Sequence, residues 1–230
     1  MSPVKREPKS RLDRDFVVGV AMTLVDREGL DALTIRRLAA ELSVTPMALY
    51  WHFEDKQALL DALSDQLWVE ARDRAFGHTA VDEDDEWGQL RHVIRALVDV
   101  FREHPTLSNW APFRVTECEA GLEVTEWTLA LLGRVGLNPE RAAEVARYLL
   151  GSAVMLVGNQ PGLAIPNADV REEMTRSKQA KLLTLSPERY PHILAASSYL
   201  VACDSPEVYY ALGVDLIVGG VRTASANLVR

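Results

Sequence analysis

Apolar residues recur along the chain at spacings of three and four residues, the period of one face of an α-helix. No segment alternates apolar and polar residues for long enough to predict a strand, so the pattern predicts an all-α protein. The first helix is expected from about residue 13 to 28 and ends at Gly29, a residue typical of the position after a helix. Its buried stripe is expected to comprise Phe16, Val20, Leu24 and Val25.

Three more helices are expected before residue 80. Thr34 can cap the second, which extends to Leu42, and Thr45 can cap a short third helix that begins with Pro46. Asp55 can cap a fourth that extends to about residue 76. After the acidic run VDEDDEW, further helices are expected near residues 84–103, 116–135, 139–158, 170–185, from 187 onward and 206–228. We divide the chain into two domains, residues 1–65 and 66–230.

Composition places the chain among soluble globular proteins, with 230 residues, 48% hydrophobic and 25% charged. The two cysteines, Cys118 and Cys203, are isolated in sequence, which is typical of buried thiols in a reducing compartment. The start of the sequence has no apolar segment of a secretion signal, and the longest apolar runs are too short to cross a membrane. A cytoplasmic protein without membrane contact is expected.

The net charge of −8 is unevenly distributed. Residues 1–60 carry nine basic and nine acidic side chains, so the whole acidic excess lies in the rest of the chain. The basic residues nearest the start are Lys5, Arg6, Lys9 and Arg11. Such a charge distribution permits contact with a phosphate backbone at one end of the molecule only.

The segment TPMALYWHFEDK, residues 45–56, places four ring-bearing side chains in a row. Two short helices joined by a tight connection, the second starting with Thr-Pro, predict a helix-turn-helix. Leu49 and Phe53 are spaced to face the core together, which leaves Met47, Tyr50, Trp51 and His52 outside it. These side chains either pack under another domain or face DNA, where the N-terminal turn of such a helix enters the major groove.

The run LTIRRLAAELSVTPMALYWHFEDKQALLDAL, within residues 12–65, resembles the DNA-binding domain of the TetR family of repressors. The shared pattern comprises T-x-R-x-L-A-x-x-L, L-Y-W-H and L-L-D-A-L. The segment YYALGVDLIVGGV also resembles the C-terminal helix of the tetracycline-repressor-like subgroup. The resemblance implies an N-terminal three-helix DNA-binding domain and a C-terminal helical domain for effector binding and dimerisation.

The resemblance also implies roles for individual residues. Arg36 aligns with an arginine that reads a guanine, although it could instead pair with a carboxylate such as Glu41. Pro46 and Met47 stand where the subgroup has Gln-Pro, so the preferred operator should differ at that base pair. The remaining expected DNA contacts are Thr45, Tyr50, Trp51, His52 and Lys56.

The helix that begins at Pro206 is apolar on two sides, and so is the segment RAAEVARYLLGSAVMLVG. A helix that is apolar on both sides must be covered on both sides, either inside one subunit or by a partner chain. The TetR resemblance favours the partner, in a four-helix bundle between two subunits. A homodimer would read a palindromic operator. The expected interface residues are Leu149, Ala153, Leu212, Leu216, Gly219 and Gly220.

Large rings in the middle of the chain predict a cavity for a small molecule. The expected contacts are Trp110, Phe113, Trp127, Arg72 and Asn159. By resemblance, the tetracycline repressor holds its drug through magnesium bound by a histidine in a loop that here reads SNWAPFR. No histidine lies in that loop, and the nearby His104 aligns poorly with the ligand position. We therefore expect no metal or other cofactor, and an effector other than tetracycline.

The sequence thus predicts a ligand-responsive transcriptional repressor that binds a palindromic operator as a homodimer and is released by a small-molecule effector. One alternative is a constitutive DNA-binding regulator, and another is a helical enzyme with a docking domain. The enzyme is disfavoured because no nucleophile, phosphate-loop or metal-ligand motif is present. Glu117 and Glu119 are two apart on an expected helix, so they face different directions.

Overall fold

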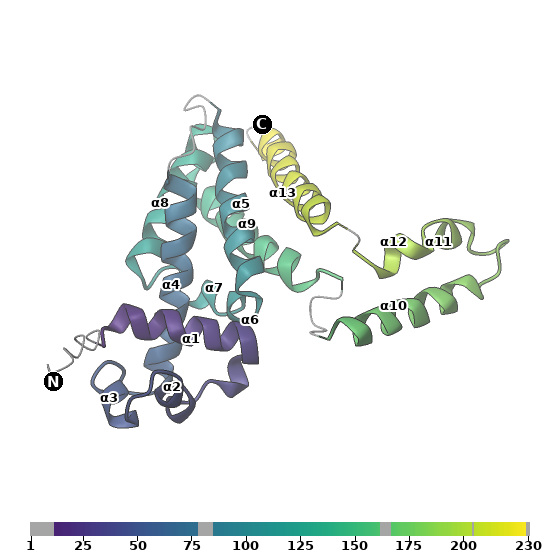
Figure 1. The fold of residues 1–230 in the computed structure, drawn as a ribbon. Helices are drawn as coiled ribbons and strands as arrows, with labels where there is room; N and C mark the ends of the chain where they lie inside the picture. Colours follow the sequence, from purple (N-terminus) through teal and green to yellow (C-terminus); the bar gives the residue numbers. More distant parts are fainter. Residues whose placement is uncertain (1–11, 78–84, 162–166, 204, 229–230) are drawn as a thin grey trace, which may run out of the picture. The chain divides into compact units, whose positions relative to one another are not determined.

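The computed structural model describes residues 12–77, 85–161, 167–203 and 205–228. Every regular element in these ranges is helical, which confirms the all-α prediction (Figure 1). The basic residues Lys5, Arg6, Lys9 and Arg11 lie outside the described residues.

The helices of the described ranges are labelled in chain order. Their bounds are α1 Arg14–Glu28, the 3-10 helix η1 Leu30–Ala32, α2 Ile35–Glu41, α3 Pro46–Tyr50, α4 Lys56–Phe76, α5 Glu86–Glu103, α6 Pro105–Ser108, α7 Ala111–Arg114, α8 Glu119–Arg134, α9 Pro139–Gly158, α10 Ala168–Leu183, α11 Pro191–Ala195, α12 Ser197–Val201 and α13 Pro206–Leu228.

Local capping fixes where the first four α-helices begin. The side chains of Thr34, Thr45 and Asp55 each accept a hydrogen bond from the backbone N–H three residues later, as the sequence predicted. Asp13 does the same at the start of α1. At the other end of α1, Gly29 adopts φ 84°, a conformation that favours glycine. These caps explain why the predicted and observed helices of this region agree closely.

The chain forms two compact units, and the first comprises residues 1–77 and 103–125. Within this unit α1 lies across α4, and α2 and α3 pack together beside α1 (Figure 1). The core includes Leu24 from α1, Leu38 from α2 and Leu49 from α3. The indole Nε1 of Trp68 donates to the carbonyl of Ala111 at 3.0 Å, which connects α4 to α7.

One expectation for α1 is wrong. Leu24 and Val25 are buried as expected, but Phe16 is 50% exposed. The stripe begins instead at Val17 and continues through Ala21. Since neighbouring residues of an α-helix point about 100° apart, the buried stripe that starts at residue 17 leaves residue 16 on the opposite side of the helix.

The second unit comprises residues 78–102 and 126–230. Within it α13 packs against α9, and α10 packs against α12. Tyr210, Val214 and Val218 form the buried side of α13. A Cβ atom at Gly213 would overlap the side chain of Leu156, so glycine allows the two helices to approach closely.

The predicted domain boundary after residue 65 falls inside α4 and stays a prediction. No helix among the described residues is long and apolar enough to cross a membrane.

Candidate nucleic-acid interface

The turn between α2 and α3 is held by backbone hydrogen bonds. The N–H of Ser43 donates to the carbonyl of Ala40 at 3.1 Å, and that of Val44 donates to Ala39 at 2.9 Å. Ser43 adopts φ 54°, a left-handed conformation that lets the chain reverse within a few residues. This turn presents the N-terminal end of α3.

The helix α3 and the residues after it are anchored on one side only. Leu49 and Phe53 are 0% and 1% exposed, as their spacing predicted. Met47, Tyr50 and Trp51 are exposed, with Trp51 at 86%. Three large exposed side chains on and directly after one short helix form an apolar patch, a feature that commonly marks an interaction site.

His52 is partly buried, and the side chain of Thr45 caps the start of α3. His52 is half-buried, and its ring lies 6.5 Å from that of Phe53, so only part of the imidazole faces outward. The hydroxyl oxygen of Thr45 accepts the N–H of Ala48 at 3.4 Å. Its O–H remains able to donate, for example to a phosphate oxygen. Pro46 is exposed at the first position of α3.

Two basic residues on the helices that flank α3 in sequence are exposed. Lys56 is the first residue of α4, immediately after the helix cap Asp55. Arg36, on α2, makes no ion pair with any residue that the structure describes. The alternative partner considered for Arg36, Glu41, is bound by other arginines. The guanidinium of Arg36 is therefore available for an external acceptor.

The partners of Glu41 are Arg37 at 2.7 Å and Arg27 at 3.2 Å. Both arginines also bind Glu28, so the four side chains link the end of α1 to α2. Hydrogen bonds from Arg37 and then Arg27 lower the pKa of Glu28 and of Glu41. The network orients α2 relative to α1 without using Arg36.

The family patterns match most of the chain. Residues 17–63 match the pattern described as "Bacterial regulatory proteins, tetR family", and residues 80–225 match "Tetracyclin repressor-like, C-terminal domain". The chain belongs to the TetR family. The family is one of transcriptional regulators, and membership confirms the expected function, a ligand-responsive DNA-binding repressor whose partners are operator DNA, an effector and a second subunit.

Named relatives cover nearly the whole chain. The HTH-type transcriptional repressor DrrR1 of Streptomyces coeruleorubidus is 31% identical over 96% of this chain and 82% of its own length. The tetracycline repressor protein class G of Vibrio anguillarum is 27% identical over 96% of this chain and 98% of its own. Among solved structures, the TetR family protein ActR of Streptomyces coelicolor in complex with actinorhodin has a TM-score of 0.75 and 25% identity, covering 94% of this chain and 98% of that one.

Three of the expected effector contacts lie in the first unit. Trp110 is half-buried, and its ring meets that of Phe113 edge-on at 6.4 Å between centroids. Phe113 itself is 73% exposed. Arg72 forms ion pairs with Asp73 at 2.8 Å and Glu123 at 3.2 Å. The structure thus brings Trp110 and Phe113 together, and Arg72 has acidic partners of its own.

The other two expected effector contacts lie in the second unit. Trp127 is half-buried on α8, and Asn159 is an exposed residue that caps the C-terminal end of α9. Their role in effector binding stays a prediction.

The outer sides of α13 and α9 carry exposed apolar residues. Leu212 and Leu216 are exposed, as is Val208 on the same stripe of α13. Gly219 and Gly220 have open space where a side chain would project. This is the surface that the sequence assigned to a partner subunit.

Two expected interface residues of α9 have a different environment. Leu149 and Ala153 are buried within their own chain, because the side of α9 that carries them packs on that chain's own helices. This corrects the expectation for both residues. Tyr148 and Met155 are the large apolar residues that α9 leaves exposed.

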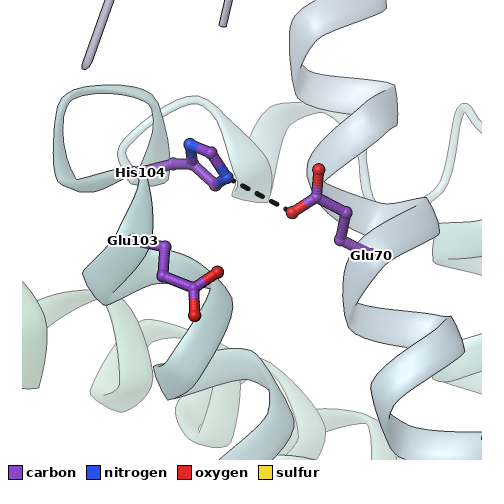
Figure 2. Close-up of side chains that lie close together, drawn as sticks. All are labelled: Glu70, Glu103 and His104. Carbon is purple, nitrogen blue, oxygen red and sulfur yellow. Dashed lines mark hydrogen bonds and ion pairs between the residues drawn. The ribbon is translucent and has the colours of Figure 1, made fainter. Parts of the chain in front are cut away.

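Sequence reasoning missed a cluster around His104. Its Nδ1 lies 2.8 Å from a carboxylate oxygen of Asp26. Its ring is directed toward Glu70 (Figure 2), and its Nε2 lies 3.2 Å from a carboxylate oxygen of that residue. Burial alone lowers the pKa of His104, but the hydrogen bonds to Asp26 and Glu70 outweigh it and raise the pKa from 6.5 to about 9. Glu103 lies beside them, and it pairs with Arg74. Asp26 and Glu70 lie 78 and 34 positions from His104, so the sequence pattern could not indicate these contacts. The sequence shows only that Pro105, a residue typical of a helix start, follows His104.

Proposed function

We propose that this repressor inserts the N-terminal turn of α3 into the major groove, and that the exposed rings beside it contact the flanking backbone. The observation that supports this is the separation of faces on and after α3. Leu49 and Phe53 are held in the core, whereas Met47, Tyr50 and Trp51 are exposed. A helix that is anchored on one side and ring-rich on the other fits the dimensions of a major groove.

Arg36 is the residue that we propose for direct base reading. Its guanidinium carries two parallel donors that match O6 and N7 of guanine. Arg36 is exposed, and Glu41 is bound by Arg37 and Arg27 instead. Thr45, Tyr50, His52 and Lys56 supply donors for phosphate oxygens. Pro46 and Met47 would contact a thymine methyl group where a glutamine is absent.

The experiment is selection of DNA fragments from a random library by the full-length wild type and by Arg36→Ala. The wild type should select a palindrome, and Arg36→Ala should lose about 1–3 kcal/mol and the preference at one base pair per half-site. Arg176→Ala, a substitution of an exposed arginine on α10, is the matched control and should select the wild-type sequence. Unchanged selectivity in Arg36→Ala would remove the base-reading role.

The effector is proposed to bind near Trp110 and Phe113 of the first unit, whose rings lie together, with Arg72 as a polar contact. Contacts to Trp127 and Asn159 of the second unit stay predictions. Binding would favour a conformation in which the two recognition helices no longer match the groove spacing. A roughly 100-fold loss of DNA affinity requires only about 2.7 kcal/mol of differential affinity between the two conformations.

A thermal-shift screen distinguishes this repressor from a constitutive regulator. Actinorhodin and tetracycline, the compounds in the names of two relatives, should be included. Tetracycline is expected to have no effect, because the loop of residues 108–114 has no histidine. A compound that raises the melting temperature should also release operator DNA. If no compound in a broad library does so, the constitutive interpretation is favoured.

We also propose that the dimer forms through the exposed stripe of α13, with Leu212, Leu216, Gly219 and Gly220 at its centre. We propose no catalytic activity. Glu117, one of the acidic candidates, is paired with Arg114 at 2.7 Å, which is typical of a structural ion pair.

A further inference from the structure

Four side chains from three segments of the first unit converge on one point. Asp26 comes from α1, Glu70 from α4, and Glu103 and His104 from the junction of α5 and α6. One ligand atom from each of Glu70, Glu103 and His104 lies within 4.8 Å of the others. Figure 2 shows the imidazole of His104 directed toward Glu70, with the carboxylate of Glu103 on the adjoining turn.

The backbone around His104 holds its imidazole in place. Pro105 begins α6 directly after it, and the carbonyl of His104 accepts the N–H groups of Leu107 and Ser108 at 3.0 and 3.1 Å. The side chain is only 15% exposed, and a hydrogen bond occupies each ring nitrogen. The orientation of the imidazole is therefore already fixed, so binding a metal ion would cost little further side-chain entropy.

The charges of the cluster favour a cation. Asp26, Glu70 and Glu103 supply three carboxylates, and Arg74 is the guanidinium paired with Glu103. The three carboxylates outnumber the guanidinium and the imidazolium, so the cluster keeps an excess of negative charge that a divalent ion would offset. The proton on Nε2 of His104 occupies the position that a metal ion would take when that nitrogen becomes a ligand.

We propose that Glu70, Glu103 and His104 form a binding site for a divalent first-row transition-metal ion, of which Zn²⁺ is the most suitable probe. Imidazole nitrogen with carboxylate oxygens is a ligand set that zinc accepts, and a fourth position is left for water. Asp26 accepts the Nδ1–H of His104, an arrangement that commonly orients histidine ligands and increases their basicity.

Modest movement of one side chain completes the coordination sphere. Ligand bonds of roughly 2.0–2.2 Å bring neighbouring ligand atoms to about 3.4 Å from one another. The Nε2 of His104 and the carboxylate oxygen of Glu70 already lie 3.2 Å apart, so Glu103 is the ligand that must move toward the other two. Its side chain is 52% exposed, so the interaction that this movement must give up is the ion pair with Arg74. The cluster is separate from the loop of residues 108–114, where the family resemblance suggests a histidine ligand.

The test uses full-length protein treated with a chelator and passed into metal-free buffer. Calorimetric titration with zinc chloride should give one high-affinity ion per chain, with a rise in melting temperature. His104→Gln and Glu103→Gln should each weaken zinc binding at least tenfold, and Asp26→Asn should weaken it about 10–100-fold. His192→Gln, which removes an exposed histidine on α11, is the matched control and should bind as the wild type does.

Glu103→Gln keeps the test decisive if His104→Gln fails to fold. Residue 103 is exposed, so in the presence of chelator this variant should melt near the temperature of the wild type. X-ray absorption of the zinc-loaded protein should show one imidazole nitrogen with oxygen ligands. The proposal is overturned if the wild type takes up no stoichiometric zinc, or if Glu103→Gln and His104→Gln bind it as tightly as His192→Gln does. Because no DNA is used, failure here would leave the proposed repressor function intact.

Discussion

Substitution of two residues near the end of α3 should separate DNA binding from folding. Phe53 is 1% exposed, so Phe53→Ala deletes a whole buried ring and should cost about 3–5 kcal/mol of unfolding free energy. The guanidinium of Arg14 lies 5.3 Å from the centre of that ring, and loss of this contact adds about 0.5–1 kcal/mol. Trp51 is 86% exposed, so Trp51→Ala should change the unfolding free energy by no more than about 0.5 kcal/mol.

The two measurements are urea unfolding followed by circular dichroism and fluorescence anisotropy with a labelled operator fragment. Phe53→Ala should shift the urea midpoint strongly. Trp51→Ala should unfold as the wild type does but bind the operator about tenfold more weakly, which corresponds to about 1.4 kcal/mol. Tyr199→Ala removes a similarly exposed ring on α12, 75% against 86%, and is the matched control, expected to change neither quantity.

Two outcomes would refute this reasoning. If Trp51→Ala unfolds as early as Phe53→Ala, the indole contributes to the core and the exposed surface after α3 is not a free one. If Trp51→Ala and Tyr199→Ala bind the operator equally well, the ring-rich surface does not face DNA. The second result would leave the helix-turn-helix in place but move its contact surface.

Three further predictions test other parts of the molecule. Lys56→Ala should weaken binding to every sequence alike and reduce the salt slope by about one unit in anisotropy titrations. Leu216→Glu should shift dimer toward monomer in sedimentation velocity, since it puts charge on the exposed stripe of α13; a variant that stays dimeric would place the interface elsewhere. Arg37 and then Arg27 hold the pKa of Glu41 below its usual 4.5, so this carboxylate adds stability above pH 4.5 that is lost as the pH falls. The deficit of Glu41→Gln in urea unfolding should therefore shrink in acid, and a pH-independent deficit would contradict the ion pairs.

Local sequence determined most of what was predictable about the fold. The caps Thr34, Thr45 and Asp55 each satisfy a backbone N–H three residues away, so the start of each helix depends only on neighbouring residues. The burial of Leu49 and Phe53 follows in the same way from their spacing on one face. These features need no knowledge of how distant segments pack.

The features that escaped prediction depend on distant segments. The helix α9 is apolar on two sides, so its sequence alone does not show which side packs on the chain's own helices. The structure shows that the side with Leu149 and Ala153 does so. Glu41 also pairs with Arg27 of α1, 14 positions away, a contact that the spacing of residues within α2 does not indicate. The cluster of His104 with Asp26 joins residues 78 positions apart, a contact that helical periodicity cannot reveal.

Polar contacts of the first unit converge on α4. Asp65 accepts the guanidinium of Arg114 at 3.0 Å, and one turn further on Trp68 donates to the α7 carbonyl. Glu70 then meets His104, just before α6. Three positions of α4 between residues 65 and 70 are therefore held by the segment that contains α6 and α7. Any displacement of that segment is passed to α4 through bonds that are directional and short.

The same helix carries a candidate DNA contact at its other end. Lys56 is the first of the 21 residues of α4, so the helix is about 32 Å long. A rotation of about 5° around the Asp65–Glu70 region would move the start of the helix by roughly 1–2 Å, because that region lies about half the length away. A hydrogen bond to phosphate is lost over such a distance, since its donor and acceptor must stay within about 3.2 Å. An effector that shifts α6 and α7 slightly could thus weaken DNA binding without unfolding any helix.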